Sequence, residues 1–248
     1  MNPRFSTFAA MSCLLVAVAC TADAPAPGTS DLTRSLLAQP AGDGMSTPLA
    51  AIPSVGEAVP DVPVEEIGFN RGRIEAPVKV IEMSDYGCGY CRQFHQETFP
   101  TLLTQFIDAG LVEWKFVPYI TGMFDNSLAA TEAAECTYVQ SAAAFERLNA
   151  RLWDDQSVWK GADAPAPVVR AWAAELGIDM MAFDACLESD SQINRIASST
   201  ALAREIGVRG TPTFIVIGYP PLQGALPLAV FQDVLTRVYA ATTGEPGL

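Results

Sequence analysis

The sequence is poor in basic residues and nearly lacks histidine. Its 248 residues include 15 lysines and arginines against 28 aspartates and glutamates, a formal net charge of −13, and a single histidine, His95. Because nucleic acids and anionic membrane surfaces are bound through basic patches, this balance argues against both as partners. A zinc site needs further cysteine pairs or closely spaced histidines, and the chain offers neither, so we expect no metal.

Long hydrophobic runs are also missing beyond the N-terminus. The apolar region 213–231 is interrupted by glycines and prolines, so it does not provide the roughly 20 apolar residues of a membrane span. At the N-terminus, residues 1–19 combine a basic start, a short apolar stretch and small residues before Cys20, which is typical of a signal peptide. We therefore expect a mature protein in the periplasm or another extracytoplasmic compartment.

Five of the six cysteines follow this signal peptide, an odd number that calls for an explanation in a compartment that oxidises thiols. The stretch Ala-Val-Ala-Cys at 17–20 resembles the lipobox of bacterial lipoproteins. This resemblance implies acylation of Cys20 and anchoring to a membrane through that lipid, with four cysteines left to pair. The alternative is ordinary signal peptidase cleavage and a secreted protein with an unpaired Cys20.

Residues 20–65 are rich in alanine, proline, glycine and serine, and residues 21–63 contain no aromatic side chain. This composition is typical of a tether, with a root-mean-square span of roughly 35 Å for a flexible chain of this length. Farther along, residues 78–84 have the composition of a β-strand and lead directly into Cys88-Gly89-Tyr90-Cys91. A helix with apolar residues at helical spacing follows, and Pro100 should kink it.

The rest of the chain predicts an α/β fold. Residues 112–118 indicate a second strand, and 125–206 indicate an all-helical segment of four or five helices. Strand character returns at 213–217 and near Gln223, and a last helix is expected over 227–241. This order describes a thioredoxin-like fold in which a helical insertion separates the CxxC half from the proline-containing half.

The CxxC pair is the main functional signal. Cys88 is expected at a helix N-terminus, where unpaired backbone N–H groups and the helix dipole stabilise a thiolate, and Cys91 lies one turn farther along. We interpret Cys88 as the nucleophile and Cys91 as the resolving thiol of a redox pair that needs no cofactor. The rival hypothesis is a non-catalytic adaptor or a copper(I) chaperone, but no methionine or histidine cluster flanks the pair.

Glu82 lies six residues before Cys88, where strand alternation directs it to the same side as Ser84. A carboxylate there is suited to exchange a proton with Cys91; the alternative is a solvated glutamate at a strand edge. His95 is interpreted as a surface helix residue, with tuning of the site as the alternative. The remaining conspicuous side chains are expected to pack within the insertion: Trp153, Trp159, Trp172 and the pair Met180-Met181.

A third element is Gly210-Thr211-Pro212-Thr213, which places a proline directly before a strand. Together with the segments 76–78, 85–92, 98–100 and 207–214, it resembles the DsbA-type branch of the thioredoxin superfamily over residues 66–242, including DsbG-like domains. The resemblance implies that Pro212 is cis and lies against the active-site disulfide. It also implies that Thr211 pairs its backbone with a substrate peptide and that Glu82 matches the buried acid of the family.

The same resemblance implies protein substrates with thiols or disulfides, contacted around Gly89, Tyr90 and Thr211, and a membrane redox partner. Cys136 and Cys186 are expected to form a structural disulfide, since both lie in predicted amphipathic helices of an exported protein; the alternative is two buried free thiols. Closing a loop of about 50 residues in this way is worth roughly 4 kcal/mol in the chain-entropy model.

The direction of electron flow is the least determined feature. A disulfide isomerase of the DsbC type places two active sites across a cleft formed by a dimerisation domain, and residues 21–63 have too few large apolar residues to form one. We therefore expect an oxidase-like monomer. The alternative is an isomerase or reductase, because Gly89-Tyr90 and Thr211 resemble those of the isomerases.

Overall fold

The computed structural model describes residues 66–245. The predicted signal peptide (1–19) and the predicted tether (20–65), with Cys20, lie outside these residues. Among the described helices, none is both long enough and apolar enough to cross a membrane.

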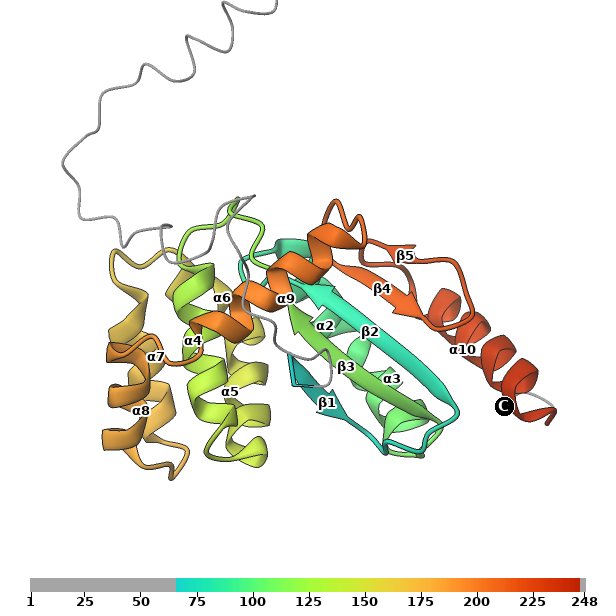
Figure 1. The fold of residues 1–248 in the computed structure, drawn as a ribbon, viewed down its shortest axis with the longest axis horizontal. Helices are drawn as coiled ribbons and strands as arrows, with labels where there is room; N and C mark the ends of the chain where they lie inside the picture. Colours follow the sequence, from blue (N-terminus) through green and yellow to red (C-terminus); the bar gives the residue numbers. More distant parts are fainter. Residues whose placement is uncertain (1–65, 246–248) are drawn as a thin grey trace, which may run out of the picture. The chain divides into compact units, whose positions relative to one another are not determined.

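A mixed five-stranded sheet forms the centre of the fold (Figure 1). Its strands are β1 (Phe69–Arg71), β2 (Val78–Ser84), β3 (Val112–Pro118), β4 (Thr213–Val216) and β5 (Leu222–Gln223). They lie in the order β1-β3-β2-β4-β5. β2 runs parallel to β3, whereas the pairs β1–β3, β2–β4 and β4–β5 are antiparallel. The strand that leads into the CxxC segment is therefore the middle strand, with a neighbour on each side.

Alternation along β2 assigns its side chains to two faces. Val78 and Val80 are buried in a cluster with apolar residues of the helices α2 (Gly89–Glu97), α3 (Phe99–Leu102) and α10 (Leu228–Thr243). Met83, which points to the opposite face, packs with Ala203 of α9 (Ile193–Glu205). Figure 1 shows α9 in front of the sheet and α2 and α3 behind it. Glu82 belongs to the face of Val78 and Val80, which α2 covers.

The helix after the CxxC segment is interrupted where the sequence predicts it. α2 ends at Glu97, Thr98 follows, and Pro100 lies in the first turn of α3, a position where a proline costs no hydrogen bond. A π-helical turn, η2 (Leu103–Ile107), continues the segment. Pro100 thus separates the short active-site helix from the turn that follows it.

Six helices connect β3 to β4, where the sequence predicted four or five. They are α4 (Ser127–Tyr138), α5 (Ala142–Asp154), α6 (Gln156–Lys160), α7 (Pro165–Ala174), α8 (Met180–Glu188) and α9. Two N-caps help to start them: Ser141 accepts a hydrogen bond from the backbone of Ala144, and Asp179 accepts from Met181 and Ala182. A disulfide joins Cys136 of α4 to Cys186 of α8, the pair expected from the sequence.

The core of this insertion is continuous with the active-site segment. One apolar cluster contains Trp153, Trp159 and Trp172 together with Tyr86, Cys88 and Cys91. The expected packing role of the three tryptophans agrees with their burial, but Met181 is 85 % exposed, so its expected packing is wrong. Met181 lies in the first turn of α8, where its backbone N–H donates a hydrogen bond to the side chain of the N-cap residue Asp179.

The predicted α/β fold with a helical insertion is confirmed. β1 was not predicted, because three residues of strand give too little alternation to be distinguished from a loop.

Candidate active site

The loop before the CxxC segment is shaped by Asp85. Its buried carboxylate accepts hydrogen bonds from the backbone of Gly87 at 2.9 Å, from the backbone of Thr121 at 3.0 Å and from the hydroxyl of Ser127. The carbonyl of Asp85 in turn accepts from the backbone N–H of Cys88 at 2.9 Å. These bonds close a tight turn that ends β2 and delivers Cys88 to the start of α2.

Gly87 is required in this turn by close packing. A Cβ atom at this position would lie 2.3 Å from Cβ of Phe124. Any larger residue would therefore displace the loop that holds Cys88.

Cys88 occupies the N-cap of α2 and carries a free thiol. A hydrogen bond from the Cys91 thiol is the main reason that the pKa of Cys88 is lowered to about 6, and the backbone N–H groups of Tyr90 and Cys91 add to this effect. Burial opposes the shift. Cys88 Sγ also lies 3.4 Å from the carbonyl oxygen of Thr211. At neutral pH the Cys88 sulfur is thus held mainly as the thiolate, the form that attacks a disulfide.

Cys91 has the opposite electrostatic environment. Burial raises its pKa well above the ordinary value, and the interaction with Cys88 raises it further. The hydroxyl of Ser84 acts in the other direction as a hydrogen-bond partner of the thiol. The two sulfurs therefore differ in protonation at neutral pH. Cys88 is mainly a thiolate that can attack, whereas Cys91 keeps its proton until a base removes it.

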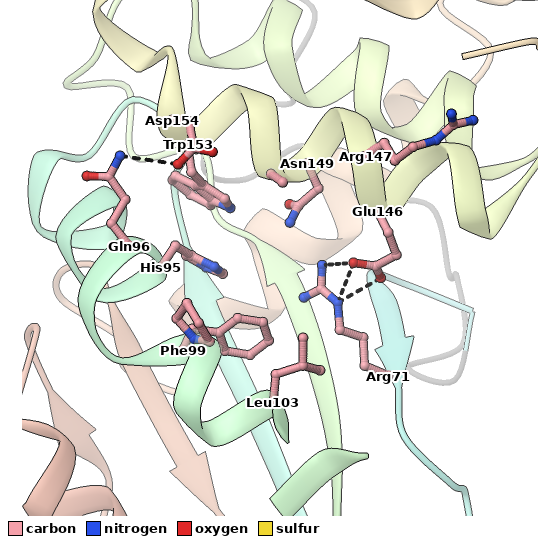
Figure 2. A pocket seen from close by; sticks show the side chains of 12 residues that line it. Arg71, His95, Gln96, Phe99, Leu103, Glu146, Arg147, Asn149, Trp153 and Asp154 are labelled. Atoms are coloured by element: carbon pink, nitrogen blue, oxygen red, sulfur yellow. Dashed lines mark hydrogen bonds and ion pairs between the residues drawn. The ribbon is translucent and has the colours of Figure 1, made fainter. Parts of the chain in front are cut away.

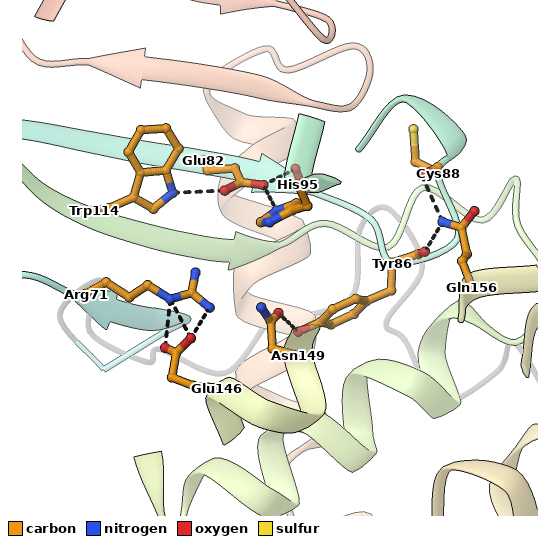
Figure 3. Close-up of polar contacts among 10 residues, drawn as sticks. Arg71, Glu82, Tyr86, Cys88, His95, Trp114, Glu146, Asn149 and Gln156 are labelled. Atoms are coloured by element: carbon orange, nitrogen blue, oxygen red, sulfur yellow. Dashed lines mark hydrogen bonds and ion pairs between the residues drawn. The ribbon is translucent and has the colours of Figure 1, made fainter. Parts of the chain in front are cut away.

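Glu82 is enclosed in the centre of the sheet rather than solvated at a strand edge, and its exposed fraction is 0 %. Its carboxylate accepts from Ser84 Oγ at 2.6 Å and from Trp114 Nε1 at 2.9 Å, and it lies 2.7 Å from His95 Nε2 (Figure 3). Burial favours the protonated acid, but the charge of the His95 ring and these hydrogen bonds outweigh it and lower the pKa of Glu82. A charged carboxylate is therefore stabilised next to Ser84.

The structure corrects the interpretation of His95 as a surface residue. Its side chain is only 3 % exposed, because the ring stacks on Trp153 of α5 at a centroid distance of 4.3 Å and an interplanar angle of 8°. The insertion thus forms the outer wall of the Glu82 environment.

Residues of α6 bind the active-site loop directly. The side-chain amide of Gln156 donates to the carbonyl oxygens of Tyr86 and Cys88 at 2.6 Å and 3.0 Å (Figure 3). Lys160 Nζ donates to the carbonyl oxygen of Gly87 at 2.5 Å. The insertion therefore satisfies three backbone carbonyls of the loop that carries the nucleophile.

The segment before β4 lies against Cys88. The Thr211–Pro212 peptide bond is cis, and the Thr211 carbonyl is the group that approaches Cys88 Sγ. On the outer side, Tyr90 is 68 % exposed and Gly89 is also exposed, so the dipeptide between the cysteines faces solvent. The geometry brings Cys88, Cys91, Thr211 and Pro212 into one site.

Sequence reasoning missed Ser84, Asp85 and Gln156 as parts of this site. Asp85 directly precedes the CxxC turn, and an aspartate two residues before a glycine is a turn signal that was available. Gln156 gave no signal, because its partners are backbone atoms far away in the chain. Within residues 66–245, no cluster of three or more cysteine, histidine or acidic side chains is arranged to hold a metal ion.

Comparisons with known proteins agree with this geometry. Residues 66–220 match the family model described as Thioredoxin. The chain is 26 % identical to a probable disulfide bond formation protein D of Bacillus cereus, over 59 % of this chain and 68 % of that protein. The structure resembles the crystal structure of α-DsbA1 of Wolbachia pipientis with a TM-score of 0.62 and 20 % identity, covering 70 % of this chain and 91 % of that chain.

A further relative is a Na(+)/H(+) antiporter, NhaA 1, of Salinispora arenicola. It is 31 % identical over 79 % of this chain, but the match covers 29 % of the antiporter. This chain therefore spans less than a third of the length of that relative.

Proposed function

Because the chain belongs to the thioredoxin family, we propose that it is of the DsbA type and exchanges disulfides with protein substrates through Cys88 and Cys91. One observation carries the proposal: the thiol at the N-cap of α2 has a pKa lowered to about 6, while that of its buried neighbour is raised well above the ordinary value. This asymmetry suits a pair in which Cys88 reacts with substrates and Cys91 resolves the product.

In the oxidising direction, a substrate thiolate attacks Sγ of Cys88 in the Cys88–Cys91 disulfide, and Cys91 leaves as a thiolate that takes up a proton. A second substrate thiolate then attacks the substrate sulfur of the mixed disulfide, and Cys88 leaves. The substrate loses two electrons, and the CxxC pair gains them. Cys88 is a good leaving group because its pKa is low.

We assign the transfer of the Cys91 proton to Ser84 and Glu82. Ser84 Oγ donates to Glu82 at 2.6 Å and is also a hydrogen-bond partner of the Cys91 thiol. Glu82 is thus linked to the sulfur through one hydroxyl, that of Ser84. Ser84 therefore contacts the thiol directly, and Glu82 is the base that favours loss of the proton through Ser84.

Of the possible directions of electron flow, oxidation of the substrate is the better supported. A low pKa at Cys88 stabilises the reduced pair, which makes the disulfide form a stronger oxidant. The isomerase or reductase alternative rests on the exposed Gly89-Tyr90 dipeptide and on Thr211. The oxidase-like proposal includes that the protein is a monomer.

The location and the membrane attachment complete the proposal. The Cys136–Cys186 disulfide supports an oxidising, extracytoplasmic compartment. We assign residues 1–19 to a signal peptide, Cys20 to lipid attachment, residues 20–65 to a tether and residues 66–242 to the catalytic domain. A membrane protein that reoxidises Cys88 and Cys91 is the partner that an oxidase requires.

Refolding assays test the function. The purified protein should restore activity to reduced ribonuclease faster than to ribonuclease with scrambled disulfides, and Cys88→Ser should abolish the effect. Cys91→Ser should instead accumulate mixed disulfides with the substrate. Faster rescue of the scrambled substrate would replace the oxidase proposal by the isomerase, and full activity of Cys88→Ser would contradict the role of the pair.

A further inference from the structure

A pocket of about 590 Å³ lies between the α2–α3 segment and α5. Figure 2 shows its walls: His95 and Phe99 on one side, Asn149 and Trp153 on the other, and Arg71 of β1 at one end. Cys88, Cys91, Thr211 and Pro212 do not line it. The pocket is therefore separate from the redox site, although His95 is common to its wall and to the Glu82 environment.

Two buried hydrogen-bond donors in this wall have no partner: Nη1 of Arg71 and Nε1 of Trp153. Both residues are enclosed, with exposed fractions of 7 % and 2 %. Nε and Nη2 of Arg71 form a bidentate ion pair with Glu146. Nη1 points toward the space between Phe99 and Asn149 (Figure 2). Buried donors without acceptors are costly and rare, so their occurrence in a single pocket points to a missing acceptor.

Two of the acceptors in the wall are already used. Asn149 Oδ1 accepts from the hydroxyl of Tyr86 at 2.7 Å, and the Glu146 carboxylate accepts from Arg71. The amide nitrogen of Asn149 points into the same space as the free nitrogen of Arg71 (Figure 2). A ligand group that only accepts hydrogen bonds fits this surplus of donors, and a carboxylate is the common group of that kind.

The rest of the pocket is lined by the polar side chains of Gln96, Arg147 and Asp154 and by apolar ones. Phe99, Leu103 and the ring of Trp153 line it beside the donors. Its volume lies within the range of about 300–1,000 Å³ typical of small-molecule sites. We propose that this pocket binds a carboxylate carried on an apolar or aromatic body, with Arg71 and Trp153 donating to the carboxylate.

The tryptophans of the protein provide a direct readout of binding. The chain has four, and the indole N–H groups of Trp114 and Trp159 are already hydrogen-bonded to Glu82 and to the Leu152 carbonyl. In a ¹⁵N–¹H spectrum of the whole protein, titration with 3-phenylpropionate should move the Trp153 indole signal downfield. The signals of Trp114 and Trp159 should shift much less, because their hydrogen-bond partners do not change.

Trp153→Phe removes the donor and retains most of the aromatic wall. It should weaken binding of 3-phenylpropionate about tenfold, the effect expected for loss of one hydrogen bond to a charged acceptor. Trp172→Phe, on α7 and outside the pocket, is the matched control and should bind as the unchanged protein does. The titration of the unchanged protein stays decisive even if a variant fails to fold.

Two comparisons complete the test. 3-Phenyl-1-propanol has the same body without the carboxylate and should bind at least tenfold more weakly. Tripeptides ending in phenylalanine, with a free or an amidated C-terminus, distinguish a peptide carboxylate from a free small acid as its source. The proposal is overturned if no carboxylate probe moves the Trp153 signal at millimolar concentration, or if the alcohol and the amidated peptide bind as well as the acids.

Discussion

Nε2 of His95 lies 2.7 Å from Oε1 of Glu82, and the two side chains are enclosed with exposed fractions of 3 % and 0 %. The same oxygen of Glu82 accepts from Ser84, whose hydroxyl also reaches the Cys91 thiol. A continuous polar path therefore leads from the resolving cysteine to a carboxylate and an imidazole within an otherwise apolar core.

Loss of the Ser84 hydroxyl should slow resolution of the mixed disulfide. Its hydrogen bond lowers the pKa of Cys91, so Ser84→Ala should raise that pKa and reduce the thiolate fraction at pH 7. A hydrogen bond worth ~1 kcal/mol corresponds to resolution about fivefold slower. Stopped-flow measurements of mixed-disulfide decay test this, with Ser189→Ala at the exposed end of α8 as the control. Equal decay rates in the two variants would remove Ser84 from the path.

The reactivity of Cys88 should depend on pH through its own thiolate. Alkylation of Cys88 in the reduced protein should follow a titration with a midpoint of about 6. Because the hydrogen bond from Cys91 is the largest cause of this low pKa, Cys91→Ala should move the midpoint upward, toward that of an ordinary thiol. Iodoacetamide rates between pH 4 and 9 measure both midpoints. An unchanged midpoint in Cys91→Ala would assign the low pKa to the helix N-terminus instead.

Gln156 should stabilise the active-site loop. Its amide satisfies the carbonyls of Tyr86 and Cys88, and Gln156→Leu would leave both without this donor. Loss of a buried partner costs about 1–3 kcal/mol, so the free energy of unfolding in urea should fall by about that amount. Gln93→Leu, on the exposed face of α2, is the matched control and should change stability far less.

Glu135 should make the protein less stable as the pH rises. Burial raises its pKa from 4.5 to about 7, and Arg195 offsets only part of this shift. The folded protein therefore binds more protons than the unfolded chain between these values, so the free energy of unfolding should fall as the pH rises from 4.5 to 7 and level off above 7. The fall from this residue is on the order of 3 kcal/mol.

Glu135→Gln should flatten this dependence, whereas Glu188→Gln at an exposed position should leave it unchanged. Burial and Asp190 also raise the pKa of Glu132, to about 7, so part of the slope should remain in Glu135→Gln. Urea unfolding at several pH values measures the slopes, and identical slopes for the two variants would contradict the assignment to Glu135.

The sequence predicted β2 and β3 with their observed bounds, because long apolar alternation on a covered sheet is an unambiguous pattern. The redox pair followed from a short motif whose chemistry depends on local geometry, and the cis form of Pro212 was implied by the resemblance to the DsbA-type branch. His95 was misplaced because its burial depends on stacking with Trp153 of α5. Contacts of that kind are set by how the insertion packs on α2, and no local pattern encodes them.

Equilibration of the protein in glutathione buffers of defined ratio, quenched by alkylation and read by mass spectrometry, tests the central claim most directly. The account predicts one two-electron transition confined to Cys88 and Cys91, with a midpoint less negative than about −200 mV, while Cys136 and Cys186 stay joined. A midpoint near that of thioredoxin, about −270 mV, would contradict the oxidase direction. A Cys88–Cys91 pair that does not exchange with glutathione at all would contradict the proposed function.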